Sequence, residues 1–148
     1  CNCGKTGCLE TGASGLAIYR IFMEKLKAGR NSILSEKYNK GEEIHLEEII
    51  DAVQEEDVLA IETIEEIGTT LGMAIAGLIN IFNPELIVLG GSVAKTKEFL
   101  LLPVRSAIQK HSLNIINSDT TIKFSKLGKK AGAIGSCMLS RSKLLGLL

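Results

Sequence analysis

Residues 83–92 read Asn-Pro-Glu-Leu-Ile-Val-Leu-Gly-Gly-Ser and contain a helix end, a strand and a turn within ten positions. Asn83 precedes a proline, a position that disfavours the helical backbone, so a helix is expected to end there. The apolar run 86–89 lies between that proline and a glycine, which is the pattern of a short strand buried on both faces by helices. The two glycines allow a close backbone approach, and Ser92 is placed to cap a following helix. The stretch therefore predicts an α/β chain.

A long buried helix is expected over residues 57–82, directly before this strand. Its apolar residues recur at spacings of three and four, which is typical of a helix face packed on a core. The uncharged part is about long enough to cross a membrane, but it holds threonines, asparagines and three glycines, so we interpret it as a core helix. Gly68, Gly72 and Gly77 each cost about 1 kcal/mol of helix propensity, which predicts a closely packed neighbour at these positions.

The remaining pattern alternates helices with a second strand. Residues 30–41 are polar and are expected to form a loop. Two strands are too few for a stable open sheet, and the first residue is Cys1 rather than methionine, so we expect a truncated piece of a longer protein. The other predicted elements are helices over 11–27, 45–54, 95–110 (with a kink or late start at Pro103) and 131–145, and a strand over 122–124.

Composition excludes several functional classes. The 148 residues carry 17 basic and 17 acidic side chains, so a net charge of zero gives no general attraction to DNA phosphates or anionic lipid. No secretory signal is visible, and four cysteines, three of them within the first eight residues, do not make a disulfide framework, which indicates a reducing, cytoplasmic location. Charge is uneven, because residues 42–66 hold 11 acids and no lysine or arginine, whereas residues 86–148 hold ten bases. These segments are either neighbouring solvated helix faces or a binding surface.

Three of the cysteines form a compact motif, which reads Cys-Asn-Cys-Gly-Lys-Thr-Gly-Cys over residues 1–8. Thiolates at Cys1, Cys3 and Cys8, with glycines free to take unusual backbone angles, can surround one soft cation, but a closed zinc site needs four ligands. Cys137 lies among small and apolar residues of a predicted helix and is interpreted as a core residue, so a fourth ligand would lie upstream. On spacing alone, metal binding and plain reduced thiols both remain open.

Three segments together resemble the ROK family of repressors, open reading frames and sugar kinases. The cysteine motif continues into Leu-Glu at 9–10 and is followed by Ser-Gly at 14–15. Residues 83–92 resemble the family's second characteristic segment, and Ala-Gly-Ala-Ile-Gly at 131–135 resembles its closing helix. The likeness spans essentially the whole chain. It implies an actin-like, ribonuclease-H-like α/β fold, mostly helical with a few strands, of which this chain would be a truncated second lobe.

The resemblance also implies roles for particular residues. Cys1, Cys3 and Cys8 match ligands of a structural zinc whose fourth ligand, an upstream histidine, is not in this sequence. Glu10 matches a glutamate that hydrogen-bonds sugar hydroxyls, a task that suits a carboxylate. The chain would divide into a zinc loop (1–10), a helical part (11–82) and a strand-helix-strand-helix remainder (83–148). In the family's kinases only, a further set matches the segment that lines the adenosine side of the cleft for ATP and magnesium: Gly90, Gly91 and Ser92.

Two functions follow from the resemblance. Residues 100–113 and 127–145 look closer to the sugar-responsive repressors, such as the N-acetylglucosamine and xylose repressors, than to glucokinases or fructokinases. We therefore predict the sugar-sensing region of a repressor that reaches DNA only through a missing N-terminal winged helix-turn-helix domain. The alternative is the C-terminal region of an ATP-dependent hexose kinase. The chain by itself is expected neither to phosphorylate a sugar nor to bind DNA specifically.

The predicted partners are a small-molecule sugar and further copies of the chain, without a membrane. A third possibility is a pure assembly module, in which the glycine-bearing helix over residues 57–82 pairs with a second copy and the protein is a homo-oligomer.

Overall fold

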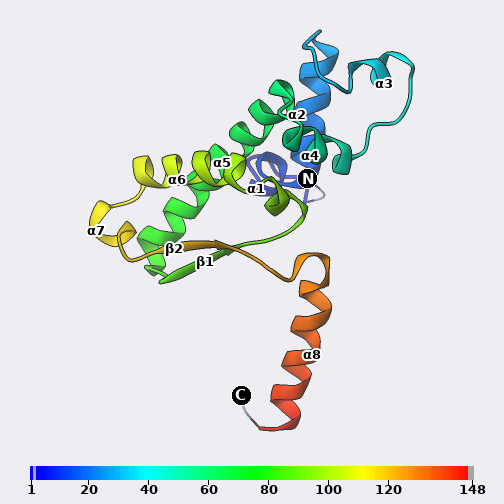
Figure 1. Cartoon of the computed structure of the whole chain (residues 1–148). Helices are drawn as coiled ribbons and strands as arrows, with labels where there is room; N and C mark the ends of the chain where they lie inside the picture. Colours follow the sequence, from blue (N-terminus) through cyan, green and yellow to red (C-terminus); the bar gives the residue numbers. More distant parts are fainter. Residues whose placement is uncertain (2, 147–148) are drawn as a thin grey trace.

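The computed structural model describes residue 1 and residues 3–146, and its elements follow an α/β order (Figure 1). Within these residues, two parallel strands form one small sheet and helices make up most of the rest. The helices are α1 (Leu9–Gly12), α2 (Gly15–Lys27), α3 (Ser35–Asn39), α4 (Leu46–Gln54), α5 (Val58–Phe82), α6 (Glu98–His111), α7 (Asn114–Asn117) and α8 (Ala131–Leu144), the strands are β1 (Leu86–Leu89) and β2 (Thr121–Phe124), and the 3-10 helices are η1 (Ser92–Thr96) and η2 (Gly128–Lys130).

Helix α5 is the central element of the fold. It begins after Asp57, whose carboxylate accepts hydrogen bonds of 2.8 Å from the backbone N–H groups of Ala60 and Ile33. It ends at Asn83, which takes a left-handed conformation with φ +42° before the proline. One face of α5 is buried against α2, α4 and α6. In the described part of the chain α5 alone has the length and apolar composition of a membrane span, and a core helix meets the same test. The prediction of a long core helix is confirmed.

Helices α5 and α6 pack closely because two glycines of α5 leave room for α6. A Cβ atom built on Gly72 would lie 2.6 Å from the carbonyl oxygen of Val104, and one built on Gly68 would lie 2.6 Å from Cγ of Pro103. Both distances are too short for a real side chain, so the expected close packing is confirmed there. At Gly77 the expectation is wrong, because no described atom lies within 4 Å of its Cβ position.

The two strands pair in parallel, with Leu86 opposite Thr121 and Leu89 opposite Phe124. Burial alternates along β1, because Leu89 is 7% exposed whereas Leu86 and Val88 are 50% and 56% exposed. The prediction that this strand is buried on both faces is therefore wrong. The described helices cover only one face of the sheet, and the other face keeps its apolar side chains exposed.

Three local expectations differ from the structure. The helix expected over 11–27 is divided into α1 and α2, because the Ser14 hydroxyl accepts a hydrogen bond from the Ala17 amide at 3.2 Å and starts a new helix. The expected loop over 30–41 contains the short helix α3. Ser92 does not cap a helix, because it is itself the first residue of η1, which has no side-chain cap.

Helix α8 extends away from the other elements (Figure 1) and has no buried residue. Cys137 is exposed on it, so the interpretation of this cysteine as a core residue is wrong. The small residues that begin α8 look like a packing surface in the sequence, but no described atom lies within 4 Å of the Cβ positions of Gly132 and Gly135. The composition of a helix does not by itself say what the helix packs against.

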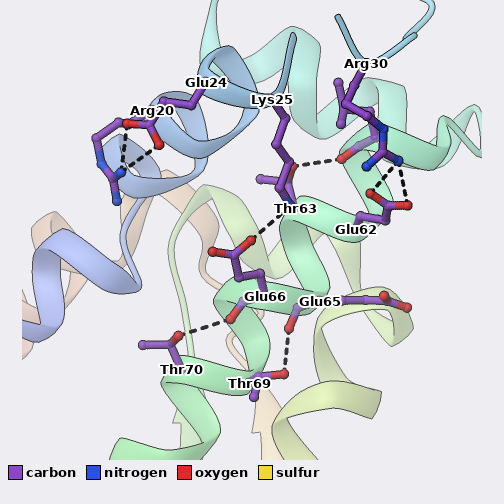
Figure 2. A network of polar contacts seen from close by, with 11 residues as sticks. Arg20, Glu24, Lys25, Arg30, Glu62, Thr63, Glu65, Glu66, Thr69 and Thr70 are labelled. Carbon is purple, nitrogen blue, oxygen red and sulfur yellow. Dashed lines mark hydrogen bonds and ion pairs between the residues drawn. The ribbon is translucent and has the colours of Figure 1, made fainter. Parts of the chain in front are cut away.

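Acids of segment 42–66 pair with bases from the first forty residues of the chain. The side chains involved stay partly exposed, so these acids lie on solvated faces, but the bases in these pairs do not come from the basic segment 86–148 that was expected to lie beside them. Two of the pairs are seen from close by in Figure 2. The pairs are Glu66 with Lys25 at 3.0 Å, Glu62 with Arg30 at 2.8 Å and Glu48 with Lys37 at 2.5 Å.

Replacing Gly72 with alanine should destabilise the protein by about 1–3 kcal/mol, because the added methyl group overlaps the backbone of α6. The measurement is the free energy of unfolding in urea. Gly77→Ala is the matched control in the same helix and should stabilise the protein by up to about 1 kcal/mol through helix propensity. Equal effects of the two substitutions would contradict close packing at Gly72.

Glu48 joins α3 to the start of α4. Its carboxylate accepts hydrogen bonds from Nζ of Lys37 at 2.5 Å and from the backbone N–H of His45 at 2.8 Å. These two hydrogen bonds hold the pKa of Glu48 below its ordinary value, and the one from Lys37 has the larger effect. The ionised carboxylate therefore stabilises the folded state above the unfolded pKa of about 4.3, and this stabilisation is lost as the pH falls through the lower folded pKa.

Glu48→Gln should lower the free energy of unfolding at pH 7 by at most about 1 kcal/mol, because the side chain is partly exposed and solvent weakens its contacts. Its difference from the wild type should shrink as the pH falls below about 4.3, and it should vanish only once the pH is below the lowered pKa of the folded state, where the carboxyl group is protonated in both states. Urea unfolding across this pH range measures the difference. Glu36→Gln, which removes only the exposed pair with Lys40, is the control and should have a smaller effect at pH 7. A difference for Glu48→Gln that does not change with pH would refute this account.

Candidate metal and sugar site

The cysteine motif, residues 1–8, folds into a tight loop in which three sulfur atoms converge. We call this segment the metal loop, because its sulfurs could hold a metal ion. The Sγ atoms of Cys1 and Cys3 lie 2.8 Å apart, those of Cys1 and Cys8 3.1 Å, and those of Cys3 and Cys8 3.3 Å. Gly4 and Gly7 both have positive φ, +72° and +78°, so the loop uses its glycines as expected. The second residue of the motif lies outside the described residues.

This set of donors fits a thiophilic ion such as zinc. Three cysteine sulfurs form one potential ligand group, and no histidine or carboxylate joins it within residue 1 and residues 3–146. Zinc–sulfur bonds of about 2.3 Å in a tetrahedral site put the sulfurs about 3.8 Å apart, so the triangle would open by less than about 1 Å around the ion. Three sulfurs make one face of a tetrahedron, which leaves a corner for one more ligand.

Hydrogen bonds inside the loop affect two of the thiols in opposite directions. A hydrogen bond from the backbone of Lys5, with a second from Cys8, lowers the pKa of Cys3. The hydrogen bond to Cys3 raises the pKa of Cys8, and burial and the charge of Glu10 add to this. Cys3 is thus the more easily ionised of the two.

Cys8 also begins helix α1, which carries Glu10. The carbonyl oxygen of Cys8 accepts hydrogen bonds from the Thr11 hydroxyl at 2.7 Å and from the Thr11 amide at 3.0 Å. Glu10 lies exposed in the first turn of this helix. It faces a hollow of about 290 Å³ next to the metal loop, so the structure brings Glu10 and the loop together. The hollow is lined by Cys1, Glu10, Thr11, Leu16, Ala17 and Arg20.

Gly90, Gly91 and Ser92 lie elsewhere, at the carboxyl end of β1. They line a second cleft of about 330 Å³, which is mostly apolar and reaches Ser14 at the start of α2. Gly91 has φ +88°, a conformation that favours glycine. The structure does not place these three residues in the hollow that Glu10 lines, so the two sets of predicted site residues belong to two cavities.

Arg20 is a site residue that the sequence pattern does not single out. It lines the hollow of Glu10 and donates a hydrogen bond from Nη2 to the Thr11 carbonyl at 3.2 Å. The pair Arg20–Glu24 has the i, i+4 spacing of an ordinary helix ion pair, which is visible in the sequence. The contact with Thr11 depends on the break between α1 and α2, which the apolar periodicity does not reveal.

Comparisons with known proteins agree with the fold and the motif. The model of the ROK family matches residues 1–143. A glucokinase of Halalkalibacterium halodurans is 36% identical to this chain over 143 residues, which cover 97% of this chain and 43% of the glucokinase. The chain therefore spans less than half the length of this curated relative.

Two solved structures show the same fold. One is the crystal structure of a ROK family transcriptional regulator, a homolog of the Escherichia coli Mlc protein. It superposes on this chain with a TM-score of 0.76 and 38% sequence identity, and the match covers 84% of this chain and 30% of the regulator. The other is a ROK family glucokinase from Streptomyces griseus, solved with glucose and AMPPNP. It superposes with a TM-score of 0.80 and 26% sequence identity, and the match covers 96% of this chain and 47% of the glucokinase. The expected actin-like α/β fold, mostly helical with two strands, is confirmed. By its motif, its fold and the match over almost its whole length, this chain belongs to the ROK family.

Proposed function

We propose that this chain is the sugar-binding C-terminal part of a longer ROK protein, and that the longer protein is a sugar-responsive transcriptional repressor. The observation that carries the sugar site is the exposed Glu10 in a hollow beside the metal loop. A carboxylate accepts hydrogen bonds from two neighbouring sugar hydroxyls with charge-assisted strength. The exposed side chain of Leu16 offers an apolar surface to the C–H groups of the sugar ring. The hollow is close to the lower end of the usual range for small-molecule sites, about 300–1,000 Å³.

A structural zinc held by Cys1, Cys3 and Cys8 would support this site. Such an ion would neutralise the three thiolates, and its bonds to sulfur would hold the loop more rigidly than weak S–H hydrogen bonds do. Cys8 immediately precedes the helix that carries Glu10, so a rigid loop limits the movement of that carboxylate. The fourth ligand would come from the part of the protein outside this chain.

The repressor is favoured by the transcriptional regulator that is 38% identical over 84% of this chain. A net charge of zero suits a sugar-sensing region whose DNA contacts lie in a separate N-terminal domain. We place the longer protein in the cytoplasm as a homo-oligomer, and we divide this chain into the zinc loop (1–10), the helical part (11–82) and the remainder (83–148).

The second candidate is an ATP-dependent hexose kinase. The glucokinase relative and the Streptomyces griseus glucokinase solved with glucose and AMPPNP favour it. In that case the cleft beside Gly90, Gly91 and Ser92 would receive the adenosine side of ATP, which would bring magnesium with it. The cleft is largely apolar, as a base-binding surface requires, and its glycines allow close approach to the backbone.

The full-length protein should bind DNA from its own promoter region and release it when the correct sugar is added, which a mobility-shift assay with a panel of sugars measures. Glu10→Gln should raise the sugar concentration for half release by about tenfold or more, because the variant loses charge-assisted hydrogen bonds. Glu98→Gln, which also removes an acid from the first turn of a helix, is the matched control and should leave release unchanged. ATP-dependent phosphorylation of a hexose without DNA binding would reject the repressor in favour of the kinase.

Metal analysis of the full-length protein should find about one zinc per chain, and Cys8→Ser should remove it because the site loses one of four ligands. Cys137→Ser is the control for general effects of removing a thiol and should keep the zinc, since this cysteine is exposed on α8. A purified wild-type protein that holds no zinc and takes up none when zinc is added would rule out the metal site.

A further inference from the structure

Helix α1 carries the proposed sugar ligand and lies against α2 and α5, with Gly12 close to Thr70, but it has no buried side chain of its own. It has four residues, none of which is buried. A single helical turn is not stable in isolation, because helix nucleation is costly. The direction of Glu10 therefore depends on contacts that other elements make with α1.

One such contact comes from Arg20 on α2. Its Nη2 donates to the carbonyl oxygen of Thr11 at 3.2 Å, while its Nη1 lies 3.0 and 3.1 Å from the two carboxylate oxygens of Glu24. The Thr11 carbonyl belongs to the end of α1, where carbonyl groups lack partners within the helix and a cation is favourable. Figure 2 shows the guanidinium of Arg20 held against Glu24.

These bonds form a continuous connection from α2 to the metal loop. Glu24 orients Arg20, Arg20 binds the Thr11 carbonyl, and the Thr11 hydroxyl binds the Cys8 carbonyl at 2.7 Å. Glu10 lies between Cys8 and Thr11 in the sequence and shares its hollow with Arg20. A guanidinium can serve a carboxylate and a carbonyl at once through its planar fork, which an ammonium group cannot do in a fixed geometry.

We propose that Arg20, clamped by Glu24, is a positioning residue that fixes α1 and thereby directs Glu10 toward the sugar. This inference rests on the proposed sugar site. The role is local, because the side chains of Arg20 and Glu24 are 50% and 60% exposed and exposed ion pairs add little to global stability. Helix α2 itself is held by buried residues such as Ile18 and Phe22.

The test compares Arg20→Gln with Arg30→Gln in the full-length protein. Arg30 is the matched control because its side chain is also 50% exposed and binds both carboxylate oxygens of Glu62, at 2.8 and 2.9 Å, on a separate part of the structure (Figure 2). Sugar affinity is measured by calorimetry, and amide hydrogen exchange is measured over residues 9–13. Arg20→Gln should raise the sugar Kd by about five- to tenfold and speed this exchange, and Arg30→Gln should do neither. Both variants should shift the melting temperature equally and only slightly.

Two further variants separate positioning from a general loss of structure. Glu24→Gln keeps the guanidinium but removes its clamp, and it should change Kd and exchange in the same direction by a smaller factor. Arg20→Lys keeps one donor for the Thr11 carbonyl and should recover part of the affinity lost in Arg20→Gln.

Arg20→Gln and Arg30→Gln with the same Kd and the same exchange rates would overturn the positioning role. If Glu10→Gln still weakened sugar binding in that experiment, the proposed sugar site would stand without it. Should the wild-type protein bind no sugar, the proposed function would fail, and unchanged exchange in Arg20→Gln would show separately that Arg20 does not fix α1.

Discussion

The close approach of α6 to α5 is the constraint on which the rest of the fold depends. It exists because Gly68 and Gly72 present no side chain where the backbone of Val104 and the ring of Pro103 arrive. Helix α5 leads directly into β1, and α6 precedes β2, so this one contact sets the two strands side by side in parallel. A parallel pair needs such a crossover helix, because a short turn cannot return the chain to the same end of the sheet. The helix covers one face of the pair and leaves the other face exposed.

The candidate site is built differently from this core. Among the described residues of the metal loop and α1 none is buried in the core, and these segments are organised by hydrogen bonds, positive-φ glycines and three converging sulfurs. Segments with few buried contacts open more readily than packed helices do. Such a segment can be restrained by a metal ion or by a side chain from a rigid helix. The loop offers three cysteine ligands for a metal ion, and α2 supplies the side chain of Arg20. The candidate site thus combines a segment with few buried side chains and a scaffold of packed helices.

This lobe suits both branches of the ROK family for the same reason. The hollow beside Glu10 and the cleft beside Gly90 are separate cavities, so one can be occupied without the other. In the proposed repressor only the first of these cavities would be occupied by a ligand, whereas in the alternative kinase both would be. The net charge of zero gives this chain no general attraction to DNA phosphates, which agrees with either function.

Most helices, both strands and the three cysteines follow from local patterns, because periodicity, helix-ending residues and a short metal motif are properties of neighbouring residues. The break at Ser14 does not, since apolar spacing continues through it and only the structure shows that the Ser14 hydroxyl accepts the Ala17 amide and starts a new helix there. The exposure of Cys137 and of one sheet face likewise depends on which surfaces meet in space. The sequence by itself therefore determined most of the elements and the three cysteines whose sulfurs cluster. Only the tertiary structure decided that Arg20 meets Thr11 and that Glu10 and the glycine turn occupy separate cavities, because contacts between distant residues depend on how whole elements pack.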